Sequence, residues 1–256
     1  MTTVADILNF METLAPRSLK MDWDNVGLLC GSRSTPVTKI LVALDPFEGV
    51  CKEAAHWGAE LIITHHPLIF RPLPSITDDT SIGRGITTLI RNGISAINAH
   101  TNLDCAEGGV NDVLAATLDL EHITTVPGDA HNLLRMGDVA EQPLGDFLAS
   151  VKEKLHCNGL RFVDGGKSVR KVAVGGGSCA DFMMEALAAC CDTFVTADCK
   201  YNQFRTAYEQ GLNLIDAGHF HTENPTMPVL AAKLQAAFPE ISVKFSANHR
   251  DCMKFY

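Results

Sequence analysis

Short apolar runs alternate with amphipathic segments along most of this chain. Val4–Leu14 has apolar residues at helical spacing, which predicts a helix that Thr2 or Thr3 caps and that ends before Pro16. Three compact apolar runs typical of buried strands follow, at residues 39–45, 60–66 and 94–100. Helical patterns separate these runs, and another covers residues 109–120. Strands that alternate with helices predict an α/β fold with parallel sheet covered on both faces.

The same order of elements returns after residues 126–132 (VPGDAHN), whose turn-rich composition is typical of a linker. RKVAVGGG (170–177) matches KILVALD, DTFVTADC (192–199) matches ELIITHH, and GLNLIDAGH (211–219) matches GISAINAH. The second copy lacks the Pro-rich loop that runs from Pro67 to about Asp79. We interpret this pattern as an internal duplication of a βαβαβ unit. It predicts two similar, interlinked α/β units, residues 1–128 and 129–256, packed around a shared cleft.

Potential metal ligands follow the strand-like runs. In open α/β sheets the carboxyl ends of the strands are the usual place for ligands. Imidazole and carboxylate groups bind first-row divalent ions and leave positions for water. The residues that meet this description are His65, His66, Asp104, His219 and Glu223. If the two units face each other, these side chains converge in one cleft.

Each of these residues also has a plainer interpretation. Adjacent residues on a strand point to opposite faces, so His65 and His66 can be one buried and one surface histidine. At a strand end, however, the backbone can turn, and Pro67 restricts His66 to extended or turn geometry. Two neighbouring ions could then take one imidazole each.

Asp104 and the later pair also allow two interpretations. Asp104 can bind a hard ion, or it can form an Asx turn or cap a helix. His219 and Glu223 have the i, i+4 spacing that places two ligands on one helical face, or they are a loop histidine and a capping acid. The segment VAVGGGS (172–178) can expose backbone amides to an anion, or it is a tight turn with Ser178 as a helix N-cap.

Composition narrows the classes of function. The net charge of −9 and a pI near 5.5 argue against broad electrostatic binding to nucleic acid or anionic membranes. Nine scattered cysteines without a CxxC motif are typical of reduced cytosolic thiols. The acidic N-terminal helix does not resemble a signal peptide, and no apolar run is long enough to span a membrane. We therefore expect a cytoplasmic protein.

Five motifs together resemble a known family. They are MDWDNVGLLCG (21–31), ITHHPLIF (63–70), NAHTNLD (98–104), TADCKYNQF (196–204) and DAGHFHTE (216–223). In this order they are similar to the NGG-interacting-factor-like dinuclear-metal proteins, also called GTP cyclohydrolase I type 2 homologues. The chain resembles a short bacterial member, without the domain that some relatives insert between the halves.

The resemblance implies that His65, His66, Asp104, His219 and Glu223 bind two divalent metal ions, with Glu223 as the bridge. It also implies a ring-shaped (toroidal) homohexamer whose metal sites face an internal cavity. Similar proteins usually have glycine within TGD or TGE, where this chain has Ala197. Alanine adopts positive φ less freely than glycine, so we expect the turn to differ there.

These observations favour a metal-dependent hydrolase that acts on a nucleotide-like or other small phosphorylated substrate. His100 is the candidate general acid or base; alternatively, it orients Asp104. Trp23, Asp24 and Asn25 either line the cleft or serve packing and capping. The ligand set accommodates Zn, Fe, Mn, Co or Ni. The alternative function is a non-catalytic metal-binding or regulatory scaffold.

Overall fold

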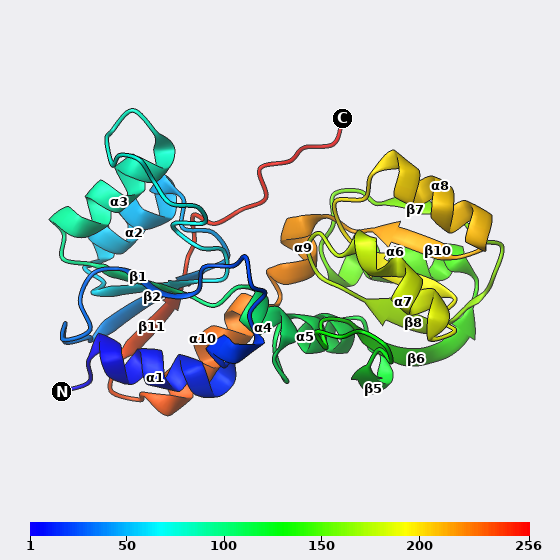
Figure 1. Cartoon of the computed structure of the whole chain (residues 1–256), viewed down its shortest axis with the longest axis horizontal. Coiled ribbons are helices and arrows are strands. Elements are labelled where there is room, and N and C mark those ends of the chain that lie inside the picture. Colours follow the sequence, from blue (N-terminus) through cyan, green and yellow to red (C-terminus); the bar gives the residue numbers. More distant parts are fainter. The chain divides into compact units, whose positions relative to one another are not determined.

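The chain folds into two compact units, each built on one sheet (Figure 1). The structure is a computed structural model that describes residues 1–256. Unit 1 comprises residues 1–103 and 227–250, and unit 2 comprises residues 104–226 and 251–256. These bounds differ from the expected division after residue 128. The strand β5 (Glu121–Thr125) pairs with β6 (Arg135–Gln142), which keeps residues before 128 in unit 2. The strand β11 (Ser242–Phe245) pairs with β2 (Lys39–Ala43), a non-local contact that returns the end of the chain to unit 1.

The sheet of unit 1 has five strands in the order β1-β4-β3-β2-β11. Their bounds are Gly27–Cys30 (β1), Lys39–Ala43 (β2), Leu61–Thr64 (β3), Ser95–Asn98 (β4) and Ser242–Phe245 (β11). The last four are parallel, and β1 runs antiparallel to β4. Thus the carboxyl ends of β2, β3 and β4 lie at one edge of the sheet.

Two of the three longer helices in the N-terminal part of unit 1 begin at a capping threonine. They are α1 (Val4–Leu14), α2 (Glu48–Trp57) and α3 (Ser81–Arg91), with a short 3₁₀ turn at Arg17–Leu19 (η1). Thr3 caps α1 in a capping box with Asp6, and Thr80 caps α3. Helix α10 (Thr226–Ala237) lies mostly in unit 1. Apolar side chains of α2 and α3, including Val50 and Leu89, are buried in one core cluster with Ile62 of β3.

Unit 2 has a six-stranded sheet in the order β5-β6-β8-β9-β10-β7. The bounds are Glu121–Thr125 (β5), Arg135–Gln142 (β6), Arg161–Val163 (β7), Val169–Val174 (β8), Thr193–Thr196 (β9) and Asn213–Asp216 (β10). Strands β8, β9 and β10 are parallel, as are β2, β3 and β4, and the outer strands pair antiparallel. The predicted α/β class is therefore confirmed in both units.

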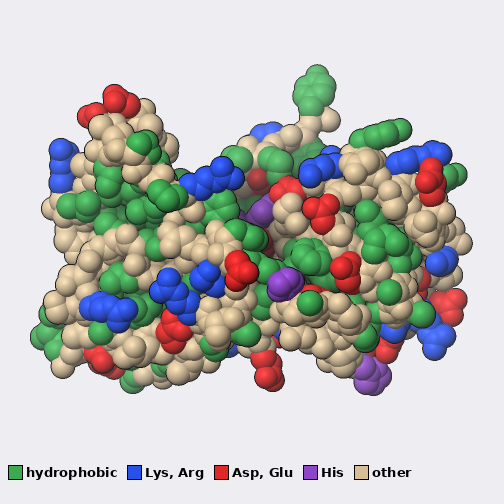
Figure 2. Space-filling view, viewed as in Figure 1, with side chains coloured by type: hydrophobic (Ala, Val, Ile, Leu, Met, Phe, Trp, Pro, Cys, Tyr) green, Lys and Arg blue, Asp and Glu red, His purple; other side chains and the backbone are tan.

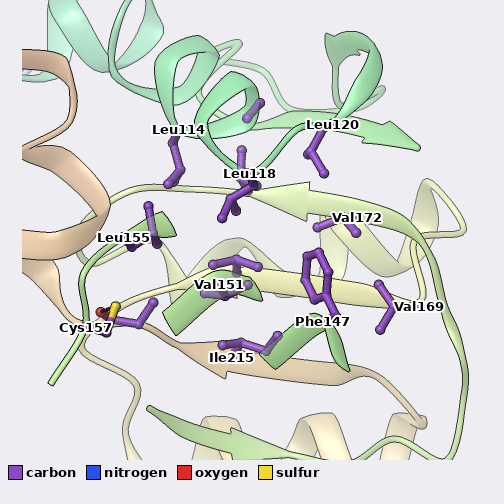
Figure 3. Packing of buried hydrophobic residues seen from close by; sticks show 14 residues of the cluster. Leu114, Leu118, Leu120, Phe147, Val151, Leu155, Cys157, Val169, Val172 and Ile215 are labelled. Carbon is purple, nitrogen blue, oxygen red and sulfur yellow. Dashed lines mark hydrogen bonds between the residues drawn. The ribbon is translucent and has the colours of Figure 1, made fainter. Parts of the chain in front are cut away.

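Helices of unit 2 pack on this sheet. They are α5 (Val110–Thr117), α6 (Leu144–Lys154), η2 (Ala180–Phe182), α7 (Met183–Ala188), α8 (Tyr201–Gln210) and α9 (His219–Glu223). Helix α4 (Thr101–Cys105) precedes α5 across the boundary between the units. Figure 3 shows Leu114 of α5 and Phe147 and Val151 of α6 in one buried cluster with Val172 and Ile215 of the sheet. This core fixes the strand ends that carry the candidate site.

Two expectations about loops are wrong. Residues 126–132 are not a linker between domains: they connect the antiparallel strands β5 and β6 inside unit 2, and linkers and hairpin turns share a turn-rich composition. Ser178 is not a helix N-cap, because η2 begins after Cys179 and has no side-chain cap. The strands predicted at residues 60–66 and 94–100 are present, but they end at Thr64 and Asn98, so His65, His66 and His100 lie in the loops that follow.

The surface carries charges of both signs. Figure 2 shows Lys and Arg side chains interspersed with Asp and Glu on the face that it displays. No helix is both long and apolar enough to cross a membrane.

Candidate metal centre

Three histidines gather at the carboxyl ends of β3 and β4 in unit 1. One ring nitrogen of each of His65, His66 and His100 lies within 4.8 Å of the others. The chain turns after Thr64, where the Thr64 hydroxyl donates to the His66 carbonyl at 2.8 Å. His65 is fully buried and the His66 side chain is 21% exposed, yet their ring centroids are only 5.0 Å apart. The turn therefore lets adjacent residues approach one site, which an extended strand does not allow.

Each imidazole of this group is oriented by an oxygen at Nδ1. His65 donates to the Ala99 carbonyl at 2.9 Å, and His66 donates to Asp45 at 2.6 Å. A proton on Nδ1 leaves the lone pair on Nε2, the nitrogen that can then bind a metal ion. This outer contact is the arrangement that metal-binding histidines usually have.

His100 is held in the same way by Asp24. Its Nδ1 lies 2.9 Å from Asp24 Oδ1, and Oδ2 of Asp24 accepts from the Thr101 amide at 3.1 Å. Burial raises the pKa of Asp24, but the hydrogen bonds from His100 and Thr101 outweigh it and lower the pKa to about 2. Asp24 is therefore ionised at neutral pH and fixes the ring of His100.

In unit 2 a single turn of helix presents two potential ligands on one face. Helix α9 begins at His219 and ends at Glu223, as the i, i+4 spacing predicts. Gly218 precedes it with φ of 85°, a left-handed conformation that glycine adopts without strain. His219 Nε2 lies 3.1 Å from Glu223 Oε2.

Asp104 joins this pair from α4. A carboxylate oxygen of Asp104 lies within 4.8 Å of one of Glu223, and both residues are buried, with 8% and 3% of their surface exposed. Asp104 lies inside α4, and the N-cap of α5 is Gly109, so Asp104 does not cap that helix. Two buried carboxylates this close repel each other unless a positive charge lies beside them. Unit 2 thus offers one imidazole and two carboxylates to a cation.

The carboxylates around His219 favour its charged form. Burial lowers the pKa of His219, but its hydrogen bonds with Asp198 and Glu223 outweigh burial and raise the pKa to about 11. Asp198 Oδ2 lies 2.7 Å from Nδ1 of His219, and this bond lowers the pKa of the Asp198 carboxyl. The residue in left-handed conformation at this turn is Asp198, with φ of 55°, and not Ala197. Aspartate tolerates that conformation, so the chain forms the turn without glycine.

The GGG turn (residues 175–177) uses its backbone amides inside unit 2 and packs beside these ligands. The amide of Gly175 donates to the Val195 carbonyl, Gly176 donates to Asn111, and Gly177 donates to Thr222. All three amides are thus used inside unit 2. A Cβ on Gly177 would lie 2.1 Å from Glu223 Oε1, so the glycine makes room for the carboxylate.

Two residues next to the histidine group, Asp45 and His249, were not identified from the sequence. Asp45 follows β2 and accepts from His66 through Oδ1, and its Oδ2 lies 2.9 Å from His249 Nε2. Asp45 stands at a strand end, the same signal that identified His65, and could have been found. His249 follows β11, a strand that the sequence pattern did not predict.

The donor set of each unit fits a divalent metal ion. Imidazole nitrogens and carboxylate oxygens are the ligands of Zn, Fe, Mn, Co and Ni sites, and here each imidazole has an outer hydrogen bond that fixes it. The residues that would hold metal are His65, His66, Asp104, His219 and Glu223, with His100 beside them.

Comparison with known proteins agrees with the resemblance that the five sequence motifs indicate. A family described as Duf34/NIF3 (NGG1p interacting factor 3) matches residues 2–252. A "GTP cyclohydrolase 1 type 2 homolog" of Clostridium perfringens is 39% identical over 236 residues, 90% of either protein. One of the same name from Clostridium acetobutylicum is 36% identical over 263 residues, 98% of either protein. The crystal structure of a Bacillus cereus protein related to NIF3 has a TM-score of 0.94 and 26% identity, and the match covers 100% of this chain and 99% of that one.

Proposed function

Because the chain belongs to the Duf34/NIF3 (NGG1p interacting factor 3) family, we propose that it is a dinuclear metal-dependent hydrolase of a nucleotide-like or other small phosphorylated substrate. The observation that carries this proposal is the outer contact of each predicted imidazole ligand. His65, His66 and His219 all have Nδ1 bonded to a carbonyl or carboxylate oxygen. Metal-binding histidines usually have this outer contact, which orients the ring toward the ion.

The two units supply complementary parts of the proposed centre. Unit 1 offers imidazoles, and unit 2 offers carboxylates with one imidazole. Two ions need more ligands than either set provides. We infer that both sets complete one centre in a cleft shared by the two units, with Glu223 as the bridging ligand.

An internal duplication explains why ligand sets arise in both units. In unit 1, Thr64 pairs with Asn98, and in unit 2, Thr196 pairs with Asp216. The residue after each β4 or β10 strand donates its amide to that threonine carbonyl, at 3.0 and 2.9 Å. Equivalent strand ends therefore have the same local geometry, which is what a duplicated βαβαβ unit would leave.

His100 is the proposed general acid or base. Asp24 holds the Nδ1 proton, so Nε2 is the atom that would take a proton from water or return one to the leaving group. Divalent ions at such a centre make water more acidic and stabilise charge on a phosphoryl oxygen. The role of this chain's residues is to hold the ions, orient His100 and bind the phosphate ester.

A turnover screen tests the proposal. The protein is purified without chelators and assayed with nucleotides and simple phosphoesters, with His100→Gln and Glu223→Ala as variants. Glu223→Ala is expected to lose both metal and turnover, whereas His100→Gln should keep the metal and lose turnover by about 100-fold or more. Turnover that persists in Glu223→Ala would refute the proposed centre.

The second candidate function is a non-catalytic metal-binding or regulatory scaffold. Stoichiometric metal without turnover on any phosphoester would favour it. The GTP ring opening suggested by the relatives' name belongs in the same screen, with GTP as substrate and formate as the product measured. The toroidal homohexamer stays a prediction that light scattering in solution tests.

A further inference from the structure

Two exposed aromatic rings stand beside the histidine group of unit 1. Trp23 is 62% exposed and Phe70 is 43% exposed. Their ring centroids lie 5.8 Å apart at an interplanar angle of 74°, and each lies 6.1 Å from the ring of His100. An indole exposed to this extent has at least one broad face in solvent. Large apolar groups exposed together usually mark a binding surface.

The backbone that carries these rings is firmly held. Asn25 donates its side-chain amide to the Ile69 carbonyl at 2.6 Å, which ties the Trp23 segment to the Phe70 loop. Asn98 of β4 donates to the Asn25 carbonyl at 3.0 Å. Asp24, next to Trp23, is buried and bonded to His100 and Thr101. The backbone from which the two rings project is therefore held in place, which reduces the entropy cost of binding.

The loop that carries Phe70 belongs to what unit 1 adds to the shared framework. Strand β9 of unit 2 is followed almost directly by α8, which begins at Tyr201. In unit 1 the loop with Phe70 lies between β3 and α3. Loops added at the carboxyl ends of strands commonly determine which ligand an α/β protein binds.

We propose that Trp23 and Phe70 form a stacking platform for a nucleobase, so that the substrate is a nucleoside phosphate. The base would rest on the exposed indole, and the phosphoryl group would reach the histidine group past His100. Aromatic side chains stack on any base, because every base has a π-face. This inference rests on the proposed function for the position of the phosphoryl group, but base stacking can be measured without turnover.

Tryptophan fluorescence gives a direct readout. The chain has two tryptophans, Trp23 and Trp57. Trp57 ends α2, and its ring lies 5.6 Å from the ammonium groups of Lys39 and Lys244. The Trp57→Phe variant therefore has Trp23 as its single tryptophan. Titration of this metal-loaded variant with GMP or AMP is expected to give saturable quenching, whereas ribose 5-phosphate should give none.

Variants at Trp23 separate stacking from phosphate binding. Trp23→Leu should weaken GMP binding by roughly tenfold or more, as measured by calorimetry, and leave ribose 5-phosphate binding unchanged. Trp23→Phe keeps a ring and should retain most of the affinity. Unchanged metal content establishes that these variants keep the fold.

Three results would overturn the platform: equal quenching by ribose 5-phosphate, GMP affinity that Trp23→Leu leaves unchanged, or a Trp23 that acrylamide cannot quench before ligand is added. The last result would mean that another protein surface covers the rings. Base-dependent quenching with no turnover on any ester would support the platform and contradict only the proposed hydrolase.

Discussion

The parallel strands β2–β4 of unit 1 and β8–β10 of unit 2 have the same contacts at their amino ends and different side chains after their carboxyl ends. At their amino ends, Glu60 accepts the backbone amide of Lys39 and Asp192 accepts that of Lys171, both at 2.8 Å. The side chain of each lysine also donates to a carbonyl at the carboxyl end of the helix that follows its strand. Lys39 donates to Trp57 at the end of α2 (3.1 Å), and Lys171 donates to Ala189 at the end of α7 (2.8 Å). The amino ends of these strands thus have the same hydrogen bonds in both units.

The carboxyl ends differ in chemistry at equivalent positions. Two residues after Thr64 comes His66, a potential ligand that Asp45 orients. Two residues after Thr196 comes Asp198, which orients the potential ligand His219. One position therefore supplies a ligand in unit 1 and an orienting carboxylate in unit 2. The shared framework supports stability, and the strand ends carry the specific chemistry.

The largest expected effect on metal affinity comes from a substitution in the GGG turn of unit 2. Gly177→Ala would place a Cβ against Glu223 Oε1 at φ of 63°, and because Glu223 is buried the carboxylate must move. Metal affinity should fall by roughly 100-fold, as measured by competition with a chelating dye. Gly93→Ala is the matched control, since Gly93 has φ of 66° and open space around it. It should cost about 1 kcal/mol of stability and leave metal affinity unchanged. Equal metal loss in both variants would refute the steric account.

Substitution of Asp45 and Asp198, the carboxylates that orient imidazoles, tests whether both units contribute equally to metal binding. Asp45→Asn and Asp198→Asn should each lower metal affinity by about 10- to 100-fold, because the amide holds the imidazole less firmly. Asp192→Asn, at the opposite end of the strands, should change stability and not metal affinity. An effect in only one of the two orienting variants would mean that one unit alone holds the metal.

Equivalent helices of the two units should differ in acid stability. Burial raises the pKa of Glu53 in α2, but hydrogen bonds from Ser246, Ala247 and Lys244 outweigh it and lower the pKa from 4.5 to about 2. A carboxyl with a lowered folded-state pKa stabilises the fold above its unfolded value, and this stability is lost as pH falls from about 4.5 to about 2. Glu53→Gln should therefore cost about 2 kcal/mol at pH 7 in urea unfolding and less near pH 2.

Glu185 occupies the same place in α7 and is only half-buried. Glu185→Gln should change the free energy of unfolding by about 0.5 kcal/mol or less at any pH. A cost for Glu53→Gln that does not shrink in acid would show that the loss comes from packing and not from the charge.

The sequence predicts the repeated core well because local patterns encode it. Apolar runs identify β2, β3 and β4 and their counterparts, and Thr3 and Pro16 bracket α1. The sequence does not reveal β6 or β11: β6 lacks clear alternation, and β11 is defined by its non-local pairing with β2. The structure divides the chain after Leu103 and again after Thr226, and the return of the chain to unit 1 depends on that pairing.

In the candidate site, too, local sequence patterns identify some residues and leave others unidentified. His219 and Glu223 were identifiable because a helical spacing links them, and the turn at His65 and His66 because a proline follows. His249 was missed because its role depends on a contact with Asp45, about 200 residues away in the sequence. Asp45 follows a strand as His65 does, and that signal was not used. Sequence patterns therefore indicate ligands more readily than the groups that orient them.

The central claim is that each chain holds two divalent metal ions. Elemental analysis of protein purified without chelators, measured alongside the protein concentration, tests it most directly. We predict two ions per chain in the unmodified protein, and at most one in Glu223→Ala and in His65→Ala with the fold retained. A well-folded protein that holds no stoichiometric metal, even after incubation with Zn, Mn, Fe, Co or Ni, would contradict the claim.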